Sequence, residues 1–129
     1  MLTLVSKSPV TYERFLKDGS VELYTQADGS PTYPRHVFLT RIVDPQGNAL
    51  SLSYDGKLRL TTLTDATGPQ TTFSYGPASS PLLVTQITDP FGRSAVLTYD
   101  GAGRLSSITE VIGLTSSFTY DASSLVTSE

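Results

Sequence analysis

The sequence predicts an all-β fold, an antiparallel meander of tandem β-hairpin repeats. Leu, Val, Ile, Phe and Tyr recur in short bursts, Ser and Thr fill the gaps, and Gly and Pro interrupt the pattern at regular intervals. Short apolar bursts separated by turn residues are typical of strands joined by tight connections. The chain has 129 residues, which is enough for one domain with a hydrophobic core.

The chain contains an internal repeat, which is the signature of a tandem architecture. Four tyrosines, spaced by 21, 24 and 21 residues, anchor it: Tyr54, Tyr75, Tyr99 and Tyr120. A glycine precedes each tyrosine by seven positions: Gly47, Gly68, Gly92 and Gly113. An acid precedes each glycine by three positions: Asp44, Asp65, Asp89 and Glu110. The longer middle spacing is a three-residue insertion within 76–81, whose composition is typical of a loop.

Each repeat contains two strand-like segments. In the first, as in residues 49–54 or 95–99, alternation places Leu52 and Tyr54 on one face and Ser53 on the other. Residues 82–88 and 105–109 represent the second segment, which begins near Leu58 in the first repeat. In a meander of such strands, the tyrosines form a row across the sheet, separated by aliphatic residues of the intervening strands.

Two kinds of turn are predicted between the strands. Asp-Pro-x-Gly at 44–47 and 89–92 favours a type I turn, whereas Asp-Gly at 55–56 and 100–101 favours a tight hairpin bend.

The regular pattern predicts two segments. Residues 1–40 form a divergent lead-in, with a hairpin around Asp18-Gly19, a turn and loop over 28–34, and a strand that starts at His36. Residues 41–129 form about four repeats, bounded as 41–62, 63–86, 87–107 and 108–129.

Composition excludes several classes of function. The formal net charge is −3 and the nine Lys and Arg are scattered singly, so nucleic-acid binding is not expected. No apolar run approaches the roughly 20 residues of a membrane helix, so membrane insertion is not expected. The N-terminus lacks the layout of a signal peptide, and the absence of Cys leaves the compartment open.

The segment 99–105, Tyr-Asp-Gly-Ala-Gly-Arg-Leu, resembles the YD-repeat motif of the Rhs family. Residues 54–60 are a close variant with Leu58 at the glycine position, and the pairs at 75–76 and 120–121 are weaker copies. The residues that define the repeat are Tyr54, Asp55, Tyr75, Tyr99, Asp100, Gly103, Arg104, Leu105, Tyr120 and Asp121, together with Gly47, Gly68, Gly92 and Gly113.

The resemblance implies a structural role. In Rhs proteins, in the C component of Tc toxins and in teneurins, similar repeats wind into a hollow β-shell. The bacterial shells enclose a toxic C-terminal domain, and in teneurins the repeats belong to an adhesion ectodomain. The expected chain is thus an open strip of a β-spiral shell, a fragment with its fourth repeat unfinished. Its expected partners are further repeats, an enclosed toxin or effector domain, and its own copies through open sheet edges. It would be secreted or carried to the cell surface with a parent protein or by a dedicated secretion system.

The sequence does not predict an enzyme, a cofactor or a metal. Related shells resemble self-cleaving proteins with an Asp-Pro-x-Gly-Leu core. The segments that begin at Asp44 and Asp89 do not have the Leu, and the segment that begins at Glu110 has the Leu without the Asp and the Pro. Turns are therefore the preferred interpretation of these acids. His36 is the only histidine, which excludes a Ser-His-Asp relay within the chain. Asp18 and Asp28 do not have the spacing of a calcium loop. The alternative function is a cell-surface carbohydrate- or receptor-binding module, with its seven tyrosines lining a groove.

Overall fold

The computed structural model describes residues 1–30 and 32–128. Pro31 and Glu129, expected in a loop and in the last repeat, lie outside the described residues. The described residues form thirteen strands and no helix, which confirms the predicted all-β meander. They fall into two compact units, Met1–Gln70 and Thr71–Glu129.

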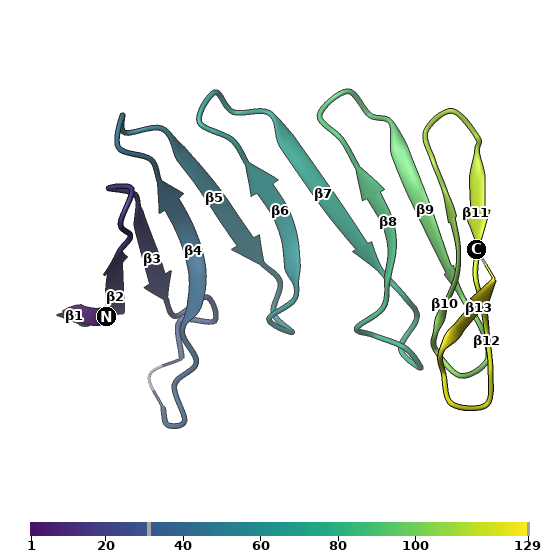
Figure 1. The fold of residues 1–129 in the computed structure, drawn as a ribbon. Coiled ribbons are helices and arrows are strands. Elements are labelled where there is room, and N and C mark those ends of the chain that lie inside the picture. The colour runs from purple at the N-terminus through teal and green to yellow at the C-terminus, as the bar shows by residue number, and fades with distance from the viewer. Residues whose placement is uncertain (31, 129) are drawn as a thin grey trace. The chain divides into compact units, whose positions relative to one another are not determined.

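The first unit contains six strands in sequence order (Figure 1): β1 (Leu2–Lys7), β2 (Val10–Phe15), β3 (Val21–Thr25), β4 (Phe38–Val43), β5 (Ala49–Tyr54) and β6 (Leu60–Thr64). Each strand pairs antiparallel with the next. Only short turns separate most of these strands, and this is why neighbours in sequence are neighbours in the sheet.

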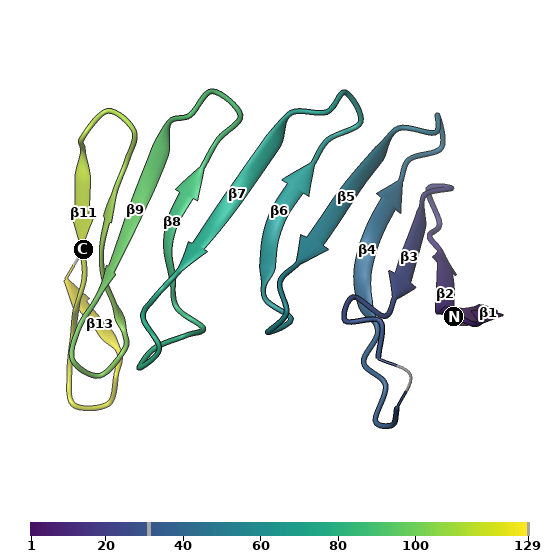
Figure 2. The same ribbon diagram turned by 180° about the vertical axis from the view of Figure 1, so that it is seen from behind.

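The second unit has the same construction, which Figure 2 shows from behind. Its strands are β7 (Gln70–Tyr75, which starts at the unit boundary), β8 (Val84–Thr88), β9 (Ser94–Tyr99), β10 (Leu105–Thr109) and β11 (Thr115–Ser117). They pair antiparallel in that order. A separate pair follows, β12 (Thr119–Tyr120) with β13 (Val126–Ser128).

The predicted facing of the strands is confirmed by their register. Directly opposed residues of antiparallel strands share a face. In the first unit Leu52 opposes Leu63 and Tyr54 opposes Leu60, whereas Ser53 opposes Thr62. In the second unit Tyr99 opposes Leu105. Each sheet therefore has an apolar face, on which aliphatic residues alternate with tyrosines, and a face rich in Ser and Thr.

The expected hydrophobic core is not formed. Among the described residues no hydrophobic side chain is buried. Within each unit a single sheet layer is present, and a sheet needs a second layer to bury its apolar face. The residues of that face, such as Phe73 and Leu97, are therefore only partly buried.

Bulges recur at one position of the repeat. The pairing skips Thr40 in β4, Thr61 in β6, Thr85 in β8 and Ser106 in β10. In each case the skipped residue is the second or third of its strand and carries a hydroxyl group. A bulge leaves one residue unpaired and disrupts the ladder locally, so the backbone groups beside it need other partners.

The lead-in segment differs from its prediction at both ends. The hairpin around Asp18-Gly19 is confirmed as β2 and β3, but a further strand, β1, precedes it. The strand expected from His36 begins at Phe38, which pairs with Thr25, the last residue of β3. His36 therefore has no partner strand and lies exposed in the preceding loop.

The lead-in also interrupts the apolar face. Glu22 opposes Ile42 and therefore lies on that face. It forms an ion pair with Arg14 at 3.4 Å and accepts a hydrogen bond from the Tyr24 hydroxyl at 2.9 Å. That hydrogen bond raises the pKa of Tyr24 above its ordinary value. A charged cluster thus occupies the position that aliphatic residues hold in the repeats.

The prediction of two kinds of turn is correct only in part: the turns expected at 44–47 and 89–92 form, whereas the tight Asp-Gly bends expected at 55–56 and 100–101 do not. Hairpins at both ends of the strands use the same five-residue turn, in which the fourth residue has a left-handed backbone. At the supposed Asp-Gly bends this residue is Leu58 (φ 61°) or Gly103 (φ 78°) rather than the Gly directly after Asp. A three-residue loop with a type I turn and a left-handed third residue is a common hairpin connection.

We predict that Leu58→Gly stabilises the chain by about 0.5–1 kcal/mol, because a left-handed backbone costs any residue with a Cβ about 1–2 kcal/mol. The midpoint of urea unfolding should rise. Lys57→Gly is the matched control and should lower the midpoint, since it adds freedom to the unfolded chain at a position without this strain. A lower midpoint for Leu58→Gly would contradict the strain argument.

Candidate functional site

The structurally conspicuous feature of the repeats is the five-residue turn. The first residue donates its N–H to the carbonyl oxygen of the fifth at 2.8–3.1 Å, and the fourth donates to the carbonyl oxygen of the first at 2.9–3.2 Å. The turns with both bonds are 16–20, 44–48, 55–59, 65–69, 89–93, 100–104, 110–114 and 121–125. The fourth residues include Gly47, Gly68, Gly92, Gly103 and Gly113, all with positive φ.

An aspartate at the first position caps most of these turns. In turn 100–104 the Oδ1 atom of Asp100 accepts the backbone N–H groups of Ala102 and Arg104, each at 2.9 Å. Asp44, Asp55, Asp89 and Asp121 accept from the third and fifth residues in the same way. Asp65 departs from the pattern because Pro69 has no N–H, and it binds the N–H groups of Thr67 and Gly68 instead.

An arginine at the fifth position closes three of the turns. Its Nε donates to Oδ2 of the capping aspartate at 2.7–2.8 Å, in the pairs Asp55–Arg59, Asp89–Arg93 and Asp100–Arg104. Side-chain and backbone hydrogen bonds from Arg59 lower the pKa of Asp55 to about 2. Bonds from Arg93 and Arg104 lower the pKa values of Asp89 and Asp100 below their ordinary value. Hydrogen bonds to the ionised form are the physical cause.

The repeat tyrosines make one further contact, which we call the tyrosine clasp. The hydroxyl groups of Tyr54, Tyr99 and Tyr120 donate to the carbonyl oxygens of Leu39, Val84 and Leu105, 15 residues earlier, at 2.7, 2.6 and 2.7 Å. Each of these carbonyls belongs to the residue directly before a bulge, Thr40, Thr85 or Ser106. The clasp thus supplies a donor where the ladder is disrupted.

Arg104 links its own turn, 100–104, to turn 121–125. Besides Asp100, its guanidinium contacts the carbonyl oxygen of Asp121 at 3.5 Å and the Ser124 hydroxyl at 3.4 Å. It also lies over the ring of Tyr120, 4.7 Å from the centroid. Since Tyr120 is itself bound to Leu105, the repeat that contains Arg104 and the next are joined by both side chains.

The other repeat residues lie at the ends of strands and in the turns that join them. Tyr75 ends β7, and Asp44, Asp89 and Glu110 each start a separate turn. Both carboxylate oxygens of Asp44 and of Asp89 accept hydrogen bonds from residues of their own turns. The geometry therefore supports the interpretation of these acids as turn residues.

The remaining candidates also lie apart. Asp18 and Asp28 each accept a backbone N–H two residues ahead, from Ser20 and Ser30, at 3.0 Å. No group of three His, Cys, Asp or Glu that could hold a metal occurs within residues 1–30 and 32–128. The same residues include no helix long and apolar enough to cross a membrane. The predicted lack of cofactor, metal and catalysis stays a prediction.

Sequence reasoning missed the acceptors of the clasp. The interval of 15 residues between Tyr54 and Leu39 recurs between Tyr99 and Val84, and it was available as a signal. It also missed the left-handed residue Ser124 (φ 61°), which stands at the glycine position of the last turn.

We predict that Tyr99→Phe destabilises the chain by about 0.5–1.5 kcal/mol, because it removes one hydrogen bond and leaves the carbonyl of Val84 without this donor. Urea unfolding measures the change. Tyr33→Phe is the control, since the side chain is 83% exposed, and it should change stability by less than about 0.5 kcal/mol. Equal effects of the two substitutions would show that the clasp contributes nothing.

We also predict an acid-dependent loss of stability in which Asp55 takes part. Its folded-state pKa of about 2 lies below the ordinary 3.8, so its contribution is fully present above pH 3.8 and is lost as the pH falls through about 2. Urea midpoints between pH 6 and pH 2 test this. Asp55→Asn should flatten the dependence and Ser53→Ala should not. An unchanged profile in Asp55→Asn would refute the role of this carboxylate.

Comparison with known families places these turns and clasps in context. The family model described as RHS Repeat matches residues 38–69, 82–112 and 99–129. The matches cover more than half of the chain and include Tyr54, Tyr99 and Tyr120 with their turns. No curated protein matches the chain. The RHS repeat is a structural repeat and not an enzymatic one. The family is therefore consistent with turns and clasps whose hydrogen bonds stabilise the fold. The chain belongs to the RHS repeat family.

Proposed function

We propose that this chain is a wall segment of a larger β-shell of YD repeats that encloses or presents a toxin or effector domain. The observation that carries the proposal is the apolar face on one side of each sheet. Its residues are only partly buried, and no hydrophobic side chain of the described residues is fully buried. A face of this kind needs a cover. In a longer array the curvature of neighbouring repeats or an enclosed domain would supply it.

The clasp and the turns favour a wall over a binding module. Each clasp joins a tyrosine to a carbonyl 15 residues earlier, outside its own repeat. Stability therefore passes from repeat to repeat as in other quasi-one-dimensional arrays. The hydroxyl groups of Tyr54, Tyr99 and Tyr120 donate to backbone carbonyls. Because these hydroxyl groups already donate within the fold, they cannot donate to a ligand at the same time. This weighs against the alternative of a tyrosine-lined carbohydrate- or receptor-binding groove.

The proposed partners follow from the same geometry. Within the described residues β1 pairs with β2 alone, and Leu2, Leu4 and Val5 on it are 43–50% exposed. An edge strand of this kind pairs readily with another chain. Further repeats of a parent protein, or a second copy of this chain, would fit there. We propose that the chain leaves the cell with its parent protein.

The test is limited proteolysis and electron microscopy of the natural gene product that carries these residues. We expect a hollow particle and a protease-resistant neighbouring domain that becomes cleavable once denaturant opens the wall. A neighbour that is cleaved at the same rate with and without denaturant would contradict enclosure. Saturable binding to a glycan array by the chain, lost when its tyrosines are replaced, would instead support the alternative function.

A further inference from the structure

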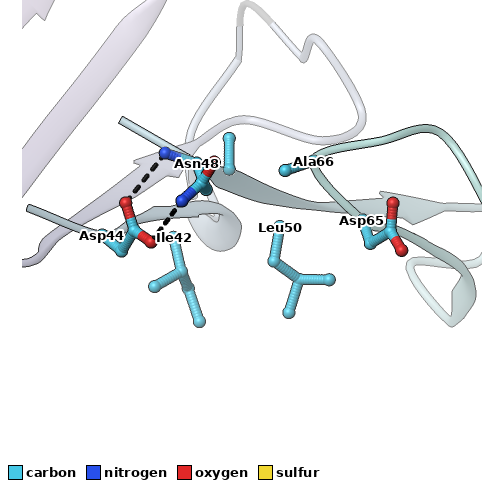
Figure 3. A pocket seen from close by; sticks show the side chains of 7 residues that line it. Ile42, Asp44, Asn48, Leu50, Asp65 and Ala66 are labelled. Carbon is cyan, nitrogen blue, oxygen red and sulfur yellow. Dashed lines mark hydrogen bonds between the residues drawn. The ribbon is translucent and has the colours of Figure 1, made fainter. Parts of the chain in front are cut away.

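A hollow of about 280 Å³ lies between the turns 44–48 and 65–69 of the first unit. Its apolar walls are Ile42, Ala49, Leu50 and Ala66, and its polar walls are Asp44, Asn48 and Asp65. Figure 3 shows the carboxylates of Asp44 and Asp65 on either side of Leu50. The hollow thus combines an apolar floor with a carboxylate at each end.

The two carboxylates differ in how far their own turns use them. Asp44 accepts backbone N–H groups with Oδ1 and the Asn48 side-chain amide with Oδ2, at 2.8 Å. Asp65 binds all its partners through Oδ1. Its Oδ2 has no hydrogen-bond donor among the described residues. No lysine or arginine lines the hollow, so the net charge of its walls is negative.

Other turns of the chain show what this frame accepts. Where the fifth residue is Arg59, Arg93 or Arg104, its guanidinium binds Oδ2 of the capping aspartate. Arg104 also extends from its own turn to turn 121–125, where it reaches Ser124. At the hollow the fifth residues are Asn48 and Pro69. Asn is too short to span the gap, and Pro has no donor group.

We propose that the hollow binds an arginine side chain presented by a protein partner. The guanidinium would donate to Oδ2 of Asp65, while its methylene stem would cover Leu50 and Ile42. The proposal repeats between molecules an interaction that this chain makes within its own turns. It does not depend on the proposed shell function.

The chemistry of the walls selects arginine among basic ligands. A guanidinium is planar, carries five donors and is weakly hydrated, so it can bind a carboxylate while resting on an apolar surface. A calcium ion would need six or more oxygen ligands. The hollow offers two carboxylates, and both already accept backbone N–H groups through Oδ1.

The probe is N-acetyl-arginine methylamide, titrated into the isotope-labelled full chain at low salt and followed by amide chemical shifts. We expect saturable shifts at residues 42, 50 and 66, with a dissociation constant on the order of millimolar because the site is open to solvent. The neutral isostere N-acetyl-citrulline methylamide should cause none. Equal shifts with both probes, no saturation, or shifts spread evenly over the other turns would overturn the proposal.

Three variants and a control sharpen the test. Asn48→Arg should fill the hollow with its own side chain, reproduce the shifts of the bound probe and abolish binding; Ala66→Leu should abolish binding by occupying the space. Asp65→Asn should weaken binding by about tenfold or more, as expected for a hydrogen bond to a charged group. Asp121→Asn, in a turn outside this hollow, should bind as the parent chain does. Unchanged affinity in both folded filling variants would also overturn the proposal.

Discussion

The five-residue turn, which a capping aspartate reinforces in most repeats, fixes the register on which the rest of the structure depends. In turn 100–104 a single oxygen of Asp100 holds the N–H groups of the third and fifth residues, which determines where the next strand starts. A slip by one residue would move every side chain of that strand to the opposite face. In turn 110–114 Glu110 makes both backbone bonds without a carboxylate contact in the described residues. The cap therefore reinforces a turn that the left-handed fourth residue already permits.

The tyrosine clasp explains why the tyrosines recur even though the sheets bury no core. A bulge raises the local twist and leaves backbone groups unpaired. At three bulges the preceding carbonyl, that of Leu39, Val84 or Leu105, receives a hydroxyl donor from a tyrosine 15 residues later. The ring can then lie on the apolar face beside Leu105 or its counterparts, while the hydroxyl reaches past it. One side chain thus combines a packing contact with a backbone hydrogen bond, and the two contacts belong to different repeats.

The strands and their facing could be predicted because both follow from the local alternation of Leu52, Ser53 and Tyr54 and from the period of the repeat. The turns could be predicted only in part. At 55–59 the Asp-Gly pair suggested a tight bend, but the Asp caps a longer loop, and the strained residue is Leu58. The clasp involves a carbonyl 15 residues away beside a bulge, and a sequence does not display bulges. The strand β1 was missed because it lies outside the repeat.

The repeats differ at the fifth position of the turn, and the residue there decides which contacts the turn makes with its surroundings. An arginine there binds the capping carboxylate of its own turn and, in the case of Arg104, also contacts turn 121–125. Asn48 satisfies the same carboxylate with a shorter side chain and leaves the space between turns open. Neither choice alters the two backbone bonds of the turn. Because the fold tolerates both residues, this position is free to decide whether a repeat binds only its neighbour or also offers a charged hollow to another molecule.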